Sequence, residues 1–122
     1  MGKFAVKETA TGFKFDLKAG NGEVIATSEV YTKKDACLNG IKSVKTNCVG
    51  EIEDLTADPV VEVKHPKFEL YEDKAGEFRF RLKARNGEVI AVSEGYKTKD
   101  SCKNGIESVK KNAPEAEIVY VE

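Results

Sequence analysis

Apolar and charged residues alternate up to a tight turn in the stretch Phe78-Arg79-Phe80-Arg81-Leu82-Lys83-Ala84-Arg85-Asn86-Gly87-Glu88-Val89-Ile90-Ala91. Alternation with a period of two is typical of a strand that is covered on one face only. The Asn86-Gly87 dipeptide suits a type I′ hairpin turn, because Asn and Gly tolerate the positive φ values that both central residues need. The stretch therefore predicts two antiparallel strands joined by a hairpin.

This stretch is written twice in the chain. Residues 3–48 align with residues 67–113 at an offset of 65, or of 64 before Gly12, and more than half of the aligned positions are identical. Each copy also opens with a short alternating run, residues 4–6 or 68–70, so each copy begins with a predicted three-stranded antiparallel meander. A unit of about 46 residues lies near the lower limit for independent stability, so we expect each copy to need the other.

After the meander, the apolar period changes to that of a helix. Apolar side chains stand at i, i+4, i+7 and i+11 in both copies: Cys37, Ile41, Val44 and Cys48, then Cys102, Ile106, Val109 and Ala113. This spacing predicts one helix of about four turns in each copy. Gly40 and Gly105 interrupt these helices at a cost of about 0.5–1 kcal/mol, which predicts a close backbone contact there, with a ligand approaching the backbone as the alternative.

A closing strand should follow each helix. We expect these strands at residues 60–64 and 117–121, with residues 50–59 forming an acidic surface loop before the first of them. The predicted order is β-β-β-α-β, twice. The expected repeats are residues 1–66 and 67–122, which together form a single compact body.

The charge of the chain is distributed unevenly. Lysines and arginines outnumber acidic residues by 8 to 5 in residues 3–49 and by 11 to 8 in residues 67–113, whereas acidic residues outnumber them by 5 to 1 in residues 50–66. A nucleic-acid binder usually has a larger and more clustered positive excess, so any such binding should be weak. The chain shows neither a membrane span nor a signal pattern, and we expect a cytoplasmic protein that does not bind membranes.

The three cysteines and the single histidine do not form a recognisable chemical site. Cys37, Cys48 and Cys102 cannot all pair within one chain, so we expect reduced thiols. Cys37 and Cys102 begin the two helices, where a thiol pKa can be lowered, but neither has a histidine nearby and both fall on the apolar face, which favours a role in the core. His65 is expected on the surface. The sequence predicts no catalytic residue, no metal site and no cofactor.

Nineteen residues of the second copy carry a resemblance to a known family: Phe78, Phe80, Leu82, Lys83, Ala84, Asn86, Gly87, Glu88, Ile90, Ala91, Ser93, Glu94, Tyr96, Asn104, Gly105, Ile106, Ser108, Val109 and Lys110. This pattern resembles the YegP-like family of small bacterial proteins, which have no known function. The resemblance implies an α+β fold in which two tandem β-β-β-α-β repeats form one antiparallel sheet, with the closing strands exchanged between repeats and two helices packed on the sheet. Exchange of the closing strands would bind two individually marginal units into one cooperative body, so we expect a monomer with an internal pseudo-two-fold axis.

Two surfaces are candidates for binding. The first is a basic row with an aromatic neighbour, formed by Arg79, Arg81, Lys83, Arg85 and Tyr71. This row could attract an anion, or it could be a solvated strand face that pairs with Glu69 and Asp73. The second is a set that recurs in both copies and should border the seam between repeats: Glu29, Tyr31, Glu94 and Tyr96. These residues could hold a polar ligand, or they could fix the strand-to-helix corner.

The sequence favours a non-enzymatic module that contacts a macromolecule, expected to be a protein, through the uncovered sheet face or the helical face. The alternative is a binder of small molecules or anions at the seam between the repeats. An enzyme ranks third, because the sequence shows no nucleophile with its base, no metal cluster and no phosphate-binding glycine loop.

Overall fold

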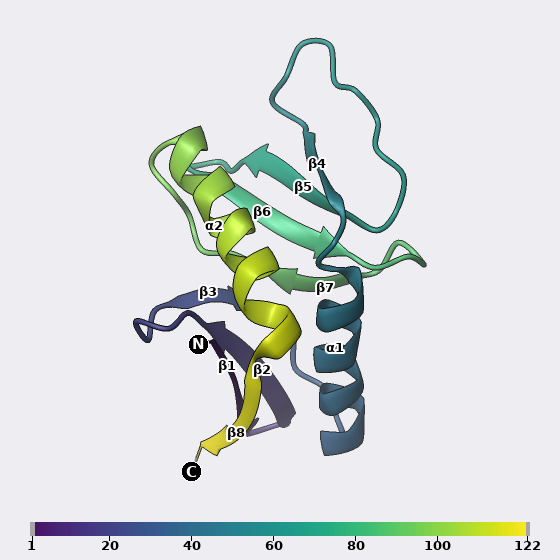
Figure 1. Ribbon diagram of the computed structural model, residues 1–122, viewed down its shortest axis with the longest axis vertical. Helices are drawn as coiled ribbons and strands as arrows, with labels where there is room; N and C mark the ends of the chain where they lie inside the picture. The colour runs from purple at the N-terminus through teal and green to yellow at the C-terminus, as the bar shows by residue number, and fades with distance from the viewer. Residues whose placement is uncertain (1, 122) are drawn as a thin grey trace.

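The computed structural model describes residues 2–121, and the described chain forms one mixed eight-stranded sheet with two helices on one face (Figure 1). The elements of the first copy are β1 (Lys3–Thr9), β2 (Gly12–Lys18), β3 (Val24–Thr27), α1 (Lys34–Asn47) and β4 (Glu51–Asp54). Those of the second copy are β5 (Lys67–Glu72), β6 (Phe78–Lys83), β7 (Val89–Val92), α2 (Lys99–Asn112), the short 3₁₀ turn Ala113–Glu115 and β8 (Glu117–Val121). The predicted fold class and the order β-β-β-α-β in each copy are confirmed.

The closing strands are exchanged between the copies. The strand order across the sheet is β4-β5-β6-β7-β3-β2-β1-β8, which reads the same from both ends when each strand is replaced by its counterpart. This symmetry is the predicted pseudo-two-fold. Each closing strand pairs with the first strand of the other copy, β4 with β5 and β8 with β1, and both pairs are parallel. The sheet is therefore mixed, and not antiparallel throughout as predicted.

The position of the first closing strand differs from the prediction. Residues 60–64 form no strand, and β4 lies at the start of the segment that was expected to be an acidic loop. The prediction was wrong because it assigned the acidic residues of β4 to a solvated loop, whereas the side chain of Glu53 is buried. Glu53 is an acceptor for Lys67 Nζ at 3.0 Å and for the Val63 amide at 2.7 Å. The connector between the copies is thus residues 55–66, while a repeat boundary between residues 66 and 67 stays a prediction.

One hydrophobic core spans both copies. Each helix packs on the second strand of its own copy and on the third strand of the other, α1 on β2 and β7, and α2 on β6 and β3. Two edge-to-face phenyl pairs, Phe4 with Phe15 and Phe68 with Phe80, are completely buried in the two halves. Burial of one such side chain contributes about 2–3 kcal/mol, and the shared helices make the contribution of each half depend on the other.

The helix glycines make the close contacts that were predicted. A Cβ atom on Gly40 would overlap the phenol of Tyr31, and one on Gly105 would overlap the phenol of Tyr96. Each tyrosine ring also stacks on a core phenylalanine at a centroid distance of 6.4 Å. The glycines therefore make room for an aromatic ring that closes the corner between strand and helix, which agrees with a packing role.

One local prediction needs correction, and the starts of the two helices differ. The hairpin after β6 is closed by the Gly87 amide, which donates to Ala84 O at 2.9 Å, and in this turn only Gly87 has a positive φ, so the turn is not type I′. The Asn86 side chain instead accepts the Glu88 amide, which favours a turn with one residue more. At the helix starts, Thr98 caps α2 by accepting the Ser101 amide, whereas Lys33 precedes α1 without a side-chain cap.

Candidate functional site

The basic row lies on the sheet face that the helices leave uncovered, and acidic partners occupy most of it. Arg79 Nε lies 2.7 Å from Asp73, and Arg81 Nε lies 2.6 Å from Glu69. Lys83 Nζ lies 3.3 Å from the same Glu69 carboxylate. The ion pairs expected of a solvated strand face are therefore present, and they leave less positive charge free to attract an anion.

The other two members of the predicted basic row lie at its margins. The guanidinium of Arg81 lies 4.6 Å from the centroid of the Tyr71 ring, so this ring is already in a cation–π contact. Arg85 is exposed and falls in the turn after β6, where its amide donates to the Asn47 side chain. The structure brings Arg79, Arg81, Lys83 and Tyr71 together and leaves Arg85 outside the row.

A buried ionic cluster continues from the basic row towards β4. Glu53, Lys67 and Glu69 are all less than 10% exposed, and Lys67 Nζ lies 3.0 Å from Glu53 and 3.5 Å from Glu69. The hydrogen bonds from the Val63 amide and from Lys67 lower the pKa of Glu53. Burial works to raise the pKa of Glu69, but Arg81 and Lys83 outweigh it and the pKa is lowered. Lys67, together with Arg81 and Lys83 of the basic row, neutralises the two carboxylates, and the hydrogen bond from the Val63 amide ties the connector to the sheet.

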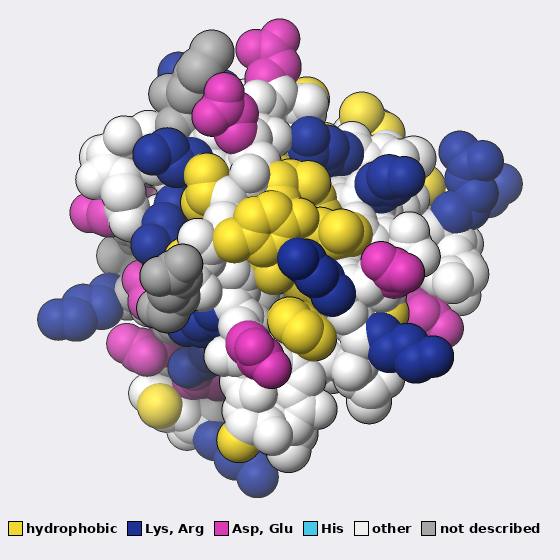
Figure 2. Space-filling model, turned by 90° about the horizontal axis from the view of Figure 1, so that it is seen from below, with side chains coloured by type: hydrophobic (Ala, Val, Ile, Leu, Met, Phe, Trp, Pro, Cys, Tyr) yellow, Lys and Arg dark blue, Asp and Glu magenta, His cyan; other side chains and the backbone are white. Residues whose placement is uncertain are grey.

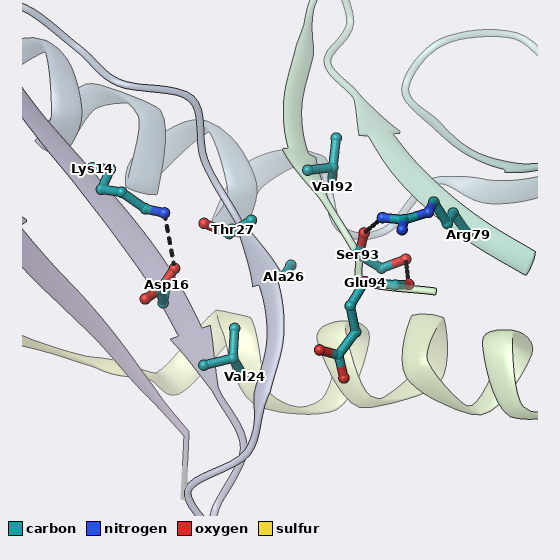
Figure 3. A pocket seen from close by; sticks show the side chains of 9 residues that line it. All are labelled: Lys14, Asp16, Val24, Ala26, Thr27, Arg79, Val92, Ser93 and Glu94. Carbon is teal, nitrogen blue, oxygen red and sulfur yellow. Dashed lines mark hydrogen bonds and ion pairs between the residues drawn. The ribbon is translucent and has the colours of Figure 1, made fainter. Parts of the chain in front are cut away.

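At the centre of the sheet, the two copies are joined by few contacts. Within the described chain, the ladder between β3 and β7 consists of a single residue pair, Thr27 with Val92. The strands diverge on both sides of this crossing, and each wedge is a hollow open to solvent. One hollow, of about 330 Å³, is lined by Lys14, Asp16, Val24, Ala26, Thr27, Arg79, Val92, Ser93 and Glu94 (Figure 3). The other, of about 190 Å³, has a related lining: Thr27, Ser28, Glu29, Val89, Ile90, Ala91 and Val92.

The charged groups of the larger hollow are already engaged. Lys14 Nζ lies 3.9 Å from Asp16, and the Arg79 side chain donates to Ser93 O at 3.4 Å, as the dashed lines in Figure 3 show. The same Arg79 pairs with Asp73 outside the hollow. The wedge thus offers an apolar floor of valines with two opposite charges at each side, and this arrangement suits a weak and shallow site.

The predicted seam residues separate into two groups. Glu29 and Glu94 are exposed and border the two hollows, so they do lie at the seam. Tyr31 and Tyr96 instead pack at the strand-to-helix corner of their own copy, and burial, followed by a nearby glutamate for Tyr31 and by Cys102 for Tyr96, raises their pKa values. Glu29 and Glu94 line the hollows at the seam, but Tyr31 and Tyr96 line neither hollow, so the four residues do not form one site.

The cysteines lie in the core. Cys37, Cys48 and Cys102 are free and buried, and burial raises the pKa of Cys102 to about 11. A thiol of that pKa is almost entirely protonated at neutral pH, which is the opposite of an activated nucleophile. His65 is exposed, with its ring near Gly87. Within residues 2–121 there is no cluster of three His, Cys, Asp or Glu side chains that could hold a metal ion.

The sequence reasoning missed a surface at the far end of the sheet, where β8 meets the first turns of α1. We call it the α1–β8 surface and define it by Lys34, Leu38, Lys42, Ile118 and Tyr120. A hollow of about 420 Å³ is lined by Asp35, Leu38, Asn39, Lys42, Ile118 and Tyr120, and Lys34 lies beside it over the Tyr120 ring. Figure 2 shows this end of the molecule, where hydrophobic side chains gather between lysines.

The outer strand of this surface is unusually apolar for a sheet edge. Ile118 is 39% exposed and Tyr120 is 56% exposed, and Val121 is exposed as well. The described part of the chain places no strand beyond β8. Natural edge strands usually carry lysine or proline to prevent pairing, and β8 has neither between Glu117 and Val121. One signal was available in the sequence, because Leu38 of α1 corresponds to the charged Lys103 of α2. The pairing registers add that Tyr120 of β8 corresponds to Asp54 of β4, so the two copies differ at this surface.

Comparison with known proteins identifies the family. The model of DUF1508, a domain of unknown function, matches residues 9–54 and again residues 73–119. The chain belongs to the DUF1508 family. The two matches cover both copies of the repeat, which confirms the tandem form and the resemblance seen in the sequence.

Members of the DUF1508 family occur with one or two repeats. A UPF0339 protein encoded 5′ of a ptx operon in Stutzerimonas stutzeri is 73% identical over 98% of this chain and 96% of its own length. A UPF0339 protein of Treponema denticola is 66% identical over 45% of this chain but 95% of its own length, so it has the length of one repeat. The solution NMR structure of yegP from E. coli, a protein of unknown function, is 35% identical, covers 98% of this chain and 91% of its own, and has a TM-score of 0.79.

None of these relatives is described with an activity, a substrate or a partner. The family is uncharacterised, and its fold is a two-repeat α+β sheet with two helices. In the described residues, neither helix has the length and apolar character required to cross a membrane.

Proposed function

We propose that this protein is a non-enzymatic interaction module, which takes an extended segment of another protein as an added strand along β8. The observation that carries the proposal is the open, apolar edge of β8, present at one end of a molecule that is otherwise nearly symmetric. Strand addition supplies main-chain hydrogen bonds from the exposed edge, and side-chain pockets beside the edge supply specificity. Here the hollow between Leu38, Ile118 and Tyr120 is such a pocket.

The opposite edge of the sheet, formed by β4, supports the assignment of β8 as the binding edge because β4 is protected. At β4 the chain continues into the connector, whose Val63 amide donates to Glu53, and three of the four β4 residues are acidic. Charged side chains and a covering loop are common means of protecting an edge. One edge of the sheet is therefore protected, and the other is left available for a partner.

The proposal can be tested with random twelve-residue peptides displayed on phage and selected on the immobilised protein. We expect selected peptides to shift the backbone amide signals of β8, β1 and the first turns of α1 in ¹⁵N-correlated NMR spectra. Ile118→Lys should weaken binding at least tenfold, because a lysine on an edge strand opposes pairing. Val61→Lys, at a 75% exposed position on the connector, is the matched control and should leave binding unchanged. Failure to select any peptide, or equal binding by Ile118→Lys, would refute the proposal.

A second candidate is a small-molecule or anion site at the seam. The observation in its favour is the pair of hollows related by the pseudo-two-fold, each lined by residues from both copies. The ion pairs of Lys14 and Arg79 argue for weak binding only. A thermal-shift titration with inorganic phosphate tests this candidate. If phosphate binds at the seam, the melting temperature should rise with phosphate concentration. Lys14→Gln should remove this rise, and the control Lys18→Gln should not.

A further inference from the structure

The two closing corners of the molecule contain equivalent lysines with different partners. In the second copy, Lys99 at the start of α2 lies 3.1 Å from the carboxylate of Asp54 on β4. Asp54 stands opposite Leu70 in the parallel ladder, as Tyr120 stands opposite Val6 in the other ladder. The lysine equivalent to Lys99 is Lys34. The second corner thus shows that a carboxylate on the closing strand can pair with the lysine at this position.

In the first copy, this lysine has an aromatic partner. Lys34 Nζ lies 4.3 Å from the centroid of the Tyr120 ring, and among residues 2–121 no carboxylate lies within 4.0 Å of it. A cation–π contact at an exposed site contributes about 0.5–1 kcal/mol, and it leaves most of the ammonium's hydrogen-bonding capacity open. Lys34 can therefore form an ion pair with a carboxylate of another molecule without losing an ion pair within the described chain.

The charge around the hollow differs between the corners in the same sense. Beside the α1–β8 hollow stand Lys34 and Lys42 against Asp35. The equivalent positions of the second copy hold two lysines against three acidic residues: Lys99, Lys103, Asp54, Asp100 and Glu107. The first corner is net positive by one charge and the second is net negative by one. An acidic segment fits the first corner and would be repelled by the second.

We infer that the partner segment bound along β8 carries a carboxylate that pairs with Lys34, beside an apolar side chain that fills the hollow between Leu38, Ile118 and Tyr120. This inference rests on the proposed function. The partner is an extended acidic segment of another protein, with the carboxylate and the apolar side chain two residues apart so that both project from one face of the added strand. At the equivalent corner, Asp54 of the chain itself supplies the carboxylate that pairs with Lys99.

Three synthetic heptapeptides test the inference. Each alternates threonine with the face Val-Glu-Val, Val-Gln-Val or Val-Lys-Val, and each is titrated into the ¹⁵N-labelled full chain while the amide signals of β8 and α1 are followed. We expect the glutamate peptide to bind at least fivefold more tightly than the glutamine peptide at 50 mM salt, and the lysine peptide to bind most weakly. The preference should shrink at 0.5 M salt, because salt screens an exposed ion pair.

Two variants separate an ion pair to Lys34 from the general charge of the protein. Lys34→Gln should abolish the preference for glutamate over glutamine, whereas Lys33→Gln, which removes the same charge one residue earlier, should preserve it. Tyr120→Asp places a carboxylate where the second copy has Asp54, so it should satisfy Lys34 internally and also abolish the preference. Far-ultraviolet circular dichroism and the melting temperature check that each variant is folded.

The outcomes distinguish this inference from the function on which it rests. If the glutamate and glutamine peptides bind β8 equally well, the carboxylate partner is refuted and strand addition stands. If no peptide shifts the β8 signals, both are refuted. If the chain instead associates with itself through β8, seen as concentration-dependent broadening of the same signals, the partner is a second copy and the assignment to another protein is wrong.

Discussion

At the α2–β4 end of the molecule, Lys99 pairs with Asp54 and the connector amide of Val63 donates to Glu53, whereas at the α1–β8 end Lys34 lies over the Tyr120 ring and β8 has an open edge. Both ends are built from the same repeat unit. They share most of their buried apolar residues because each half must fill the same space against an equivalent helix. They differ at the two edges of the sheet, where one end has a buried ionic cluster and the other has an open apolar strand, so the duplication has left one closed end and one available end.

The residues that the two copies share should give equal effects at both ends. Gly40→Val and Gly105→Val should each lower the free energy of unfolding by about 3 kcal/mol, because the new side chain would overlap the tyrosine ring that packs on the glycine. Urea unfolding measures this loss. The neighbouring exposed positions provide controls, and Asn39→Val and Asn104→Val should each cost less than about 1 kcal/mol. Clearly unequal losses at the two glycines would show that the corners are not equivalent in packing.

The ionic cluster should be important at one end only. Lys67→Met leaves the buried carboxylates of Glu53 and Glu69 without their shared ammonium, and we expect a loss of about 2–3 kcal/mol. Its counterpart Lys3 is exposed, so Lys3→Met should change the stability by no more than about 0.5 kcal/mol. Thermal or urea unfolding of the two variants gives the comparison directly. Similar effects would mean that the closed end does not depend on its ion pairs.

Acid should weaken the closed end selectively. The pKa of Glu53 is lowered by the Val63 amide and Lys67, so its contribution to stability is complete above the ordinary value of 4.5 and is lost as the pH falls through the lowered folded-state pKa. Between pH 5 and pH 3, the protection of the connector amides, measured against their intrinsic exchange rates, should therefore fall more than that of the β8 amides. Glu53→Gln should reduce this pH dependence, and it should cost less stability at pH 7 than Lys67→Met because the amide can still accept a hydrogen bond. An unchanged pH dependence in Glu53→Gln would assign the acid effect to other carboxylates.

The helix starts provide the smallest contrast. Thr98→Ala removes the hydroxyl that accepts the Ser101 amide and should cost about 1 kcal/mol. Lys33→Ala, at the equivalent helix start, removes no capping bond and should cost almost nothing. Differential scanning calorimetry can resolve this difference. Equal losses would indicate that the two helix starts are capped in the same way in solution.

Much of the repeat could be predicted from its residues. The alternation in residues 78–84 and the helical spacing of Cys102, Ile106 and Val109 describe local geometry, and every such element is present. The close contact at Gly105 was also predictable, because a glycine in a continuous apolar helix face has to be explained by packing. The first closing strand was placed wrongly because Glu53 looks solvated in the sequence, and its partner Lys67 is recognisable only after the strands are paired.

The sequence by itself determined the repeated unit, its meander and helix, and the mutual dependence of the two halves, since periodicity and size act through neighbouring residues. Only the tertiary structure decided which carboxylates are neutralised, that the closing strands run parallel to their partners, and that Leu38, Ile118 and Tyr120 meet at an open edge. These features depend on contacts between different segments, which lie 10 residues apart for Glu53 and the Val63 amide and 82 residues apart for Leu38 and Tyr120, and no local pattern encodes them. The candidate binding surface belongs to this second group, because an exposed edge exists only once every other strand has found its place.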